Sequence, residues 1–158
     1  MTPDKYPDFM AIAMREAEQA YEKGEVPVGA IVVFEDKVIG RGFNQTESLH
    51  DATAHAEILA LSAAYNHFGD WRLENCVLFS TLEPCAMCAG AAILSRIKTI
   101  VFGAHDPKFG ACGSIFNLPN DTRLNHNIEV VPGVLAEPVA EMMREFFRQV
   151  RGNKEKIN

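Results

Sequence analysis

Long apolar runs and an overall excess of positive charge are both missing from this sequence of 158 residues. Its longest mostly apolar run without a charge, Ala86 to Leu94, is far below the roughly 18 residues that a membrane helix needs. The N-terminus has no basic start followed by an apolar stretch, so we expect no secretory signal. We therefore expect a cytoplasmic protein that does not associate with a membrane.

Cysteines are few, and their pattern is not that of a disulfide scaffold. The four lie at positions 76, 85, 88 and 112 of a chain that is not small, and nothing in the sequence indicates secretion. Two of them, Cys85 and Cys88, are spaced as Cys-x-x-Cys. In a cytoplasmic chain this spacing indicates metal binding or redox chemistry.

Positive charge is scarce overall but not locally. The net charge of −6 and the pI of about 5.3 argue against a general nucleic-acid binder. All of the negative excess lies in residues 1–60, which hold 11 acidic and 5 basic residues, whereas residues 61–158 hold 10 of each. Five basic residues stand against two acidic ones near the C-terminus: Arg144, Arg148, Arg151, Lys154 and Lys156. A local basic surface is therefore compatible with the acidic total.

The remaining composition is that of an ordinary globular protein, with 47% hydrophobic residues, and the length favours one domain over residues 1–158. Hydrophobic periodicity predicts helices over 5–23, 54–67, 85–95 and 137–150 and strands over 30–34, 38–43, 76–80, 99–102 and 128–131. Asp51 or Thr53 is expected to cap the second helix. Residues 104–127 show no clear period and are expected to form a long functional loop. This order of elements predicts an α/β fold, a mixed sheet with helices on both faces.

Two short motifs carry candidate metal ligands. The first, His-Ala-Glu at 55–57, opens an expected helix, and the second, Pro-Cys-Ala-Met-Cys at 84–88, joins a strand to a helix. Cys85 and Cys88 share a face of the first helical turn, where the helix dipole stabilises thiolates. His55 and Glu57 are two residues apart and converge only beyond the N-terminal end of their helix. We therefore infer two helix N-termini that face one metal ion.

The proposed ligands are His55, Cys85 and Cys88, a nitrogen and sulfur set that suits Zn²⁺. Three protein ligands leave a fourth position for water, as in catalytic zinc sites, and Glu57 remains free beside it as a general base. One alternative is a closed structural zinc site with a fourth ligand from His50, His105, Cys76 or Cys112. Another is a redox pair of the two cysteines with His55 in the core, which leaves Glu57 without a role.

The combination of His-x-Glu with Pro-Cys-x-x-Cys is the zinc deaminase signature. Further segments make the sequence resemble the bacterial tRNA-specific adenosine deaminases over about residues 7–151. The segments are 25–30 (EVPVGA), 42–44 (GFN), 53–58 (TAHAEI), 81–91 (TLEPCAMCAGA), 95–97 (SRI), 101–104 (VFGA), 106 (D), 113–114 (GS), 125–126 (NH) and 146–148 (FFR). Two positions depart from the family pattern: Ala52 stands where proline is common, and Val150 stands where the family often has arginine.

The resemblance implies a cytidine deaminase-like fold, a five-stranded mixed sheet between helices in three layers. It implies a homodimer that hydrolytically deaminates the wobble adenosine of an arginine tRNA anticodon to inosine and releases ammonia. One Zn²⁺ per chain would lie on His55, Cys85 and Cys88, and Glu57 would shuttle protons. Because the base must leave the stack to reach the metal, the anticodon loop of a stem-loop is a natural substrate.

The resemblance also implies a set of substrate contacts: Asn44, Ala56, Asp106, Phe147, Arg148 and Arg151. Without it, Asn44 is a loop residue that caps a turn, and Asp106 is a turn or helix-cap aspartate. Arg144, Arg148 and Arg151 share one helical face, which alone is as easily a solvated face. Phe146 and Phe147 point to different sides, so one is expected in the core and the other could stack on an anticodon base. The sequence does not decide which.

Two other functions remain open at this point. The first is a deaminase of a free nucleobase or nucleoside (cytosine, guanine or adenosine), which has no use for a basic C-terminal helix. The second is a zinc-stabilised RNA-binding module without catalysis, which has no use for the free Glu57. Release of ammonia separates the second from either enzyme.

Overall fold

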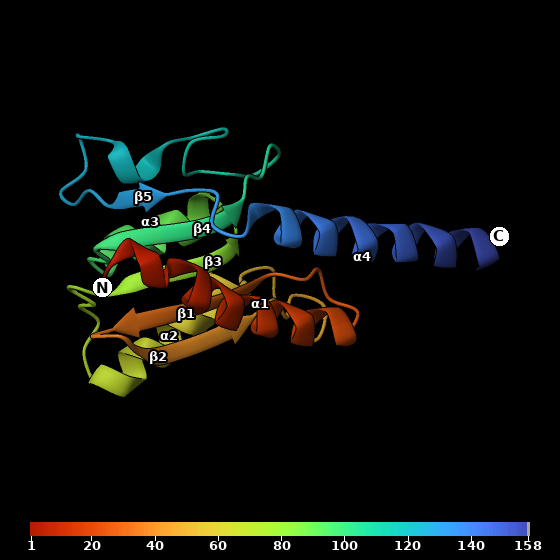
Figure 1. The fold of residues 1–158 in the computed structure, drawn as a ribbon, viewed down its shortest axis with the longest axis horizontal. Coiled ribbons are helices and arrows are strands. Elements are labelled where there is room, and N and C mark those ends of the chain that lie inside the picture. The colour runs from red at the N-terminus through yellow and green to blue at the C-terminus, as the bar shows by residue number, and fades with distance from the viewer. Residues whose placement is uncertain (158) are drawn as a thin grey trace.

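The computed structural model describes residues 1–157, and the side chains of residues 1–155, so the side chain of Lys156 lies outside the described part. Its centre is one five-stranded sheet in the order β2-β1-β3-β4-β5 (Figure 1). β1 pairs antiparallel with β2 and β3, while β3 with β4 and β4 with β5 are parallel. The strands are β1 (Gly29–Phe34), β2 (Lys37–Phe43), β3 (Val77–Leu82), β4 (Thr99–Ala104) and β5 (Glu129–Val131). The sheet is therefore mixed, as predicted.

Helices cover both faces of the sheet. α1 and α4 lie on one face, and α2 and α3 lie on the other (Figure 1). The helices are α1 (Tyr6–Glu22), α2 (Ala56–Phe68), α3 (Ala86–Leu94) and α4 (Ala136–Ile157). The predicted three-layer α/β architecture is thus confirmed. None of the helices described is both long and apolar enough to cross a membrane.

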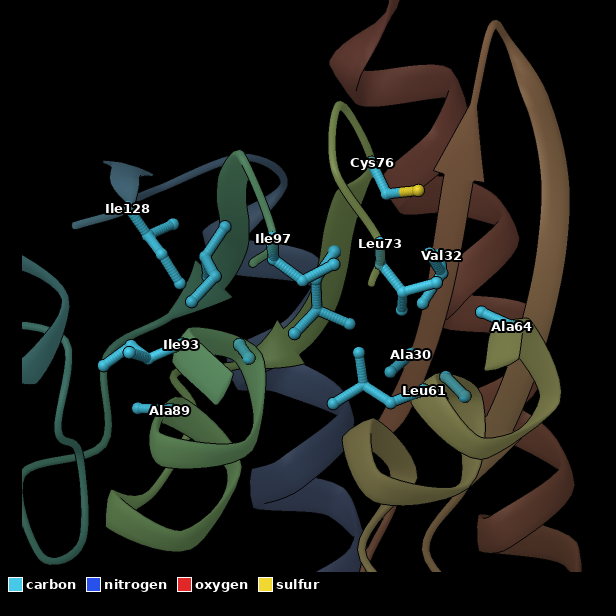
Figure 2. Close-up of a cluster of buried hydrophobic side chains, with 14 of the residues drawn as sticks. Ala30, Val32, Leu61, Ala64, Leu73, Cys76, Ala89, Ile93, Ile97 and Ile128 are labelled. Atoms are coloured by element: carbon cyan, nitrogen blue, oxygen red, sulfur yellow. The ribbon is translucent and has the colours of Figure 1, made fainter. Parts of the chain in front are cut away.

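The core consists of two hydrophobic layers, one on each face of the sheet. Along β1, Ala30 and Val32 face the layer under α2 and α3, while Ile31 and Val33 face the layer under α1. Figure 2 shows the first layer, where Leu61 of α2 points toward the strands. Burial on both faces explains why this strand is a continuous apolar run.

Two glycines in β2 determine how closely α2 approaches the sheet. A Cβ atom at Gly40 would lie 2.3 Å from the backbone oxygen of Ala60, and one at Gly42 would lie 2.3 Å from that of Ala56. Glycine weakens a strand in general, but here it lets the helix backbone pack against the strand. This contact places the first turn of α2, with its candidate site residues, at the edge of the sheet.

Two predictions of helix ends are wrong. The N-cap of α2 is His55 and not Asp51 or Thr53. Those two residues form a turn before the helix, in which the carboxylate of Asp51 accepts hydrogen bonds from the amide and the hydroxyl of Thr53 at 2.8 and 2.7 Å. The last helix, α4, continues beyond Val150 to Ile157. A single glycine, Gly152, costs only about 1 kcal/mol relative to alanine in a helix, which is too little to end it. The 104–127 segment is a loop, as expected, apart from one short 3₁₀ helix, Leu118–Asn120.

Candidate active site

Three potential metal ligands from two helix starts lie together. The Nδ1 atom of His55 is 3.6 Å from the Sγ atom of Cys85 and 3.5 Å from that of Cys88. All three ligand atoms lie within 4.8 Å of one another, and no other such group occurs among the residues described. In a tetrahedral zinc site, a nitrogen and a sulfur ligand are about 3.6 Å apart, given the usual Zn–N and Zn–S bond lengths. The donor set therefore fits Zn²⁺ in both chemistry and spacing.

Local helix geometry produces this convergence. His55 is the N-cap of α2 and Cys85 is the N-cap of α3, both with extended backbone angles. A polar N-cap side chain usually accepts a hydrogen bond from its own helix, but neither of these side chains does. Each is therefore free to turn toward the other helix. Cys88, in the first turn of α3, completes the group.

The two thiols differ strongly in acidity. A hydrogen bond from the Cys88 thiol, against the effect of burial and with help from His55, lowers the pKa of Cys85 to about 4. The same hydrogen bond, together with burial, raises the pKa of Cys88 far above that of an ordinary thiol. The hydrogen bond between His55 and Cys85 raises the pKa of His55. Without a cation, the group therefore holds one thiolate, and a divalent metal would displace the remaining protons.

Glu57 lies beside this group but is not part of it. It is in the first turn of α2 and only 4% exposed. Burial raises the pKa of its carboxyl group, partly offset by its interaction with His55. A carboxyl group that is buried next to a candidate metal site and holds its proton more tightly than usual is a candidate for general acid–base chemistry.

The residues considered as a fourth ligand lie elsewhere in the described structure. His50 is exposed, and His105 lies 3.3 Å from a carboxylate oxygen of Glu83. Cys76 is part of the hydrophobic layer in Figure 2, and Cys112 is outside the group of ligand atoms. The described residues therefore offer three ligands, the number found in open catalytic zinc sites.

A cavity of about 360 Å³ opens over the group and over Glu57. This volume is in the range of small-molecule sites. Part of its wall is apolar: Val26, Val28, Ala56, Leu82 and Phe109. Its polar side chains away from the metal group are Asn44, Thr46, Glu83 and Asp106. The sequence-predicted contacts Asn44, Ala56 and Asp106 are thus all in the wall of this cavity.

Asn44 is both a turn residue and a wall residue. Its Oδ1 atom accepts a hydrogen bond from the amide of Thr46 at 3.3 Å, and its Nδ2 atom donates to the backbone oxygen of Val26 at 3.2 Å. The side chain is 8% exposed. The loop that follows is held by Glu25, whose buried carboxylate accepts from the amide of Glu47 at 2.9 Å. Asn44 is therefore presented to the cavity in one fixed orientation.

Asp106 likewise combines a turn role with a place in the wall. Its Oδ1 atom accepts hydrogen bonds from the amides of Lys108 and Phe109 at 3.0 and 3.2 Å. Phe109 is 70% exposed and lines the cavity, although no sequence pattern singled it out. The only signal that could have found it is its position in the long 104–127 loop.

A larger groove of about 1,000 Å³ continues from the cavity. Both hollows share four wall residues: Val26, Leu82, Asp106 and Phe109. The groove is also lined by Lys108 and by residues of α4: Ala140, Met143, Arg144, Phe147, Arg148 and Arg151. The three predicted C-terminal contacts therefore lie at the groove and not in the cavity itself. Met143 also lines this groove.

The two phenylalanines of α4 have different environments. Phe146 is 7% exposed and packs edge-on against Tyr21 of α1, with ring centroids 5.8 Å apart. Phe147 is 40% exposed and faces the groove. The structure thus makes Phe146 the core residue and leaves Phe147 available to a ligand.

Acidic neighbours on α4 occupy two of its arginines. Arg144 pairs with Glu137 and Glu141 at 2.6 and 2.8 Å, and Arg148 lies 2.8 Å from Glu141 and from Glu145. These pairs are exposed, and exposed pairs contribute little to stability. The basic face predicted from the sequence exists, but it is partly neutralised by its own helix.

Comparison with known proteins identifies similar sequences. The MafB19-like deaminase family matches residues 5–151. The tRNA-specific adenosine deaminase of Bacillus subtilis (strain 168) is 47% identical over 154 residues, which cover 98% of this chain and 94% of that protein. The protein of the same name from Aquifex aeolicus (strain VF5) is 46% identical over 147 residues, covering 92% and 95%.

Solved structures of deaminases have a similar fold. A chain from a study of A-to-I editing by tRNA:A34 deaminases at the wobble position of transfer RNA matches with a TM-score of 0.82 and 41% identity, over 85% of this chain and 98% of that one. The guanine deaminase from Nitrosomonas europaea matches with a TM-score of 0.78 and 26% identity, over 92% and 84%. The deaminase fold that the sequence resemblance implied is therefore confirmed.

Proposed function

The chain belongs to the tRNA-specific adenosine deaminase family, and from this membership we propose that it converts the wobble adenosine of a tRNA anticodon to inosine. The substrate is an arginine tRNA, and the reaction is a hydrolysis that releases ammonia. The enzyme acts in the cytoplasm as a single domain over residues 1–158.

One observation supports the choice of RNA over a free base. The cavity over the His–Cys–Cys group shares four wall residues with a groove that carries Phe147, Arg148 and Arg151. A free base fills the cavity and has no use for the groove. A nucleotide in a loop needs both, because its base leaves the stack while the neighbouring phosphates and bases stay outside.

One Zn²⁺ per chain would be held by His55, Cys85 and Cys88. When bound there, zinc supplies Lewis-acid chemistry: it makes water acidic enough to act as a nucleophile near neutral pH. Three protein ligands would leave the metal able to bind water, and the buried Glu57 lies beside the ligand group to take up a proton.

The protein residues hold the base and move the protons. Asn44 binds the base, since its amide keeps one free donor and one free acceptor position beyond the two contacts described above. Ala56 and Asp106 line the space for the nucleotide. Glu57 accepts a proton from water as the water oxygen bonds to C6 of adenine, and it delivers that proton to ring nitrogen N1. It then moves the proton of the new C6 hydroxyl group to the amine, the C6–N bond breaks as the C6=O bond forms, and the amine leaves as ammonia. Adenosine and water thus give inosine and ammonia.

A homodimer completes the proposal. Among the apolar residues that are more than half exposed are Leu94 (70%) at the end of α3, and Ile115 (52%) and Phe116 (56%) in the loop after β4. Exposed apolar surface of this kind is typical of protein interfaces.

The second candidate is deamination of a free purine base. The size of the cavity and the similarity of the fold to a guanine deaminase favour it. The experiment that separates the two is incubation of the zinc-loaded protein with an anticodon stem-loop that carries a wobble adenosine, followed by sequencing for inosine. A stem-loop with its only adenosine paired in the stem is the control, and it should stay unmodified. Inosine in neither RNA, together with ammonia from a free purine, would favour the second candidate.

A further inference from the structure

The carboxylate of Glu83 is completely buried and is occupied by one loop. Its Oε1 atom accepts a hydrogen bond from the amide of Asp106 at 3.0 Å and one from the hydroxyl of Ser114 at 2.5 Å. Its Oε2 atom accepts from the amides of Cys112 and Ser114 at 3.0 and 3.1 Å. The ring of His105 adds a fifth contact at 3.3 Å. One side chain thus binds the 105–114 loop at both ends.

The loop is shaped around this side chain. A Cβ atom at Gly110 would lie 2.3 Å from Oε2 of Glu83, so only glycine lets the loop backbone approach the carboxylate this closely. The amide of Ala111 also donates to the backbone oxygen of Pro84 at 2.9 Å, and Gly110 forms a β-bridge with Cys85. The loop and the segment that carries two metal ligands therefore form one packed unit.

The same loop supplies the wall between the cavity and the groove. Asp106 and Phe109 line both hollows, and the amide of Asp106 is bonded directly to Glu83. If that bond is lost, the backbone at Asp106 is free to move, and the wall moves with it.

We propose that Glu83 is a positioning residue for substrate binding: its carboxylate holds the 105–114 loop so that Asp106 and Phe109 meet the nucleotide entering from the groove. This inference rests on the proposed RNA substrate. It differs from a role of Glu83 in proton transfer: Glu83 also lines the cavity, but every hydrogen bond described for its carboxylate goes to the loop.

Glu83→Gln is the variant to test. It keeps the volume of the side chain but replaces one acceptor oxygen by an NH₂ group, which must then face backbone N–H donors. With the zinc-loaded enzyme and the stem-loop, we expect KM to rise about tenfold or more, the effect of losing one hydrogen bond to a charged group. We expect kcat to change by less than about threefold, because the proton-transfer group Glu57 is untouched.

Glu16→Gln is the matched control. Glu16 is also a buried glutamate, 7% exposed, but it lies on α1 beside Arg41 and lines neither hollow. Its amide variant should leave KM and kcat unchanged. Ser114→Ala is a milder second variant at an exposed residue, which removes the hydroxyl donor alone and should raise KM in the same direction by a smaller factor.

Backbone hydrogen exchange gives a readout that does not depend on the substrate. The amides of Asp106, Cys112 and Ser114 should exchange faster in Glu83→Gln than in the wild type and in Glu16→Gln. Unchanged exchange at these amides, or a 10²–10⁴-fold loss of kcat at constant KM as for a proton-transfer group, would overturn the proposal. A wild-type enzyme that leaves the stem-loop unmodified would instead contradict the proposed function, and exchange would still decide whether Glu83 holds the loop.

Discussion

The Nδ1 atom of His55 and the Sγ atom of Cys88 are 3.5 Å apart, although 33 residues separate them in the sequence. With Cys85 they form a donor set that fits one zinc ion. Metal analysis of the purified protein should therefore give a ratio near one zinc per chain. Cys85→Ala should lower that ratio, and full retention of zinc after all three ligands are replaced would show that the metal is held elsewhere.

Zinc affinity should depend strongly on pH. Because the bond to the Cys85 thiolate and burial raise the pKa of Cys88, its thiol is protonated at neutral pH, and zinc must displace that proton. Affinity should therefore increase as the pH rises and decrease as it falls. Competition with a chelator at pH 6, 7 and 8 measures this. An affinity that is the same at all three values would show that no proton is released on binding.

Glu57→Ala should fold and bind zinc but lose nearly all turnover. Glu57 is buried beside the ligand group without being part of it, and a general acid–base group typically contributes 10²–10⁴-fold to the rate. Glu57→Gln, which keeps the volume, should show the same loss. Zinc content and circular dichroism of both variants provide the control. A near-native rate in either variant would assign the proton shuttle to another residue, with Glu83 the next to test.

Binding of the stem-loop should depend on the arginines at the groove. We expect Arg148 and Arg151 to contact phosphate groups of the stem-loop. Changing either one to Ala should therefore reduce the slope of log affinity against log salt concentration by about one. Zinc content and any weak activity on free adenosine should not change. Arg123→Ala is the control, because Arg123 pairs with Asp121 and lines neither hollow. If the double variant with both Arg148 and Arg151 changed to Ala has the wild-type slope, these two arginines do not contact phosphate. Lys108 in the groove is then the next residue to test.

The dimer should depend on the exposed apolar residues Leu94, Ile115 and Phe116. Leu94→Asp places a charge on a side chain that is 70% exposed in the single chain, so folding should tolerate it while a dimer interface should not. Sedimentation should give twice 17.5 kDa for the wild type and a monomer for the variant. Trp71→Asp, at another exposed apolar residue, should stay dimeric. A wild type that sediments only as a monomer at micromolar concentration would contradict the homodimer.

The elements of the fold and the ligand group were predictable because their signals are local. The continuous apolar run of β1 and the spacing of the two cysteines depend on a few neighbouring residues. The start of α2 was not predictable in this way, since local preference favours Asp51 or Thr53 as the helix cap. The helix instead begins after His55 and packs closely against Gly40 and Gly42.

The role of Glu83 and the place of Phe109 depend on long-range contacts. The partners of Glu83 lie 22 to 31 residues further along the chain, so no local pattern could have paired them. Which of Phe146 and Phe147 is buried also depends on a long-range contact. Phe146 packs against Tyr21 of α1, and the sequence of α4 alone does not show this contact.

The most direct test of the proposed function is the ratio of two specificity constants, kcat/KM for the anticodon stem-loop and kcat/KM for free adenosine, measured with the same zinc-loaded enzyme. A groove that holds the loop while the cavity holds the base predicts a much higher value for the stem-loop, and Glu57→Ala should abolish turnover of both. Equal values for the two substrates, or turnover of the free nucleoside alone, would contradict the assignment of tRNA as the substrate.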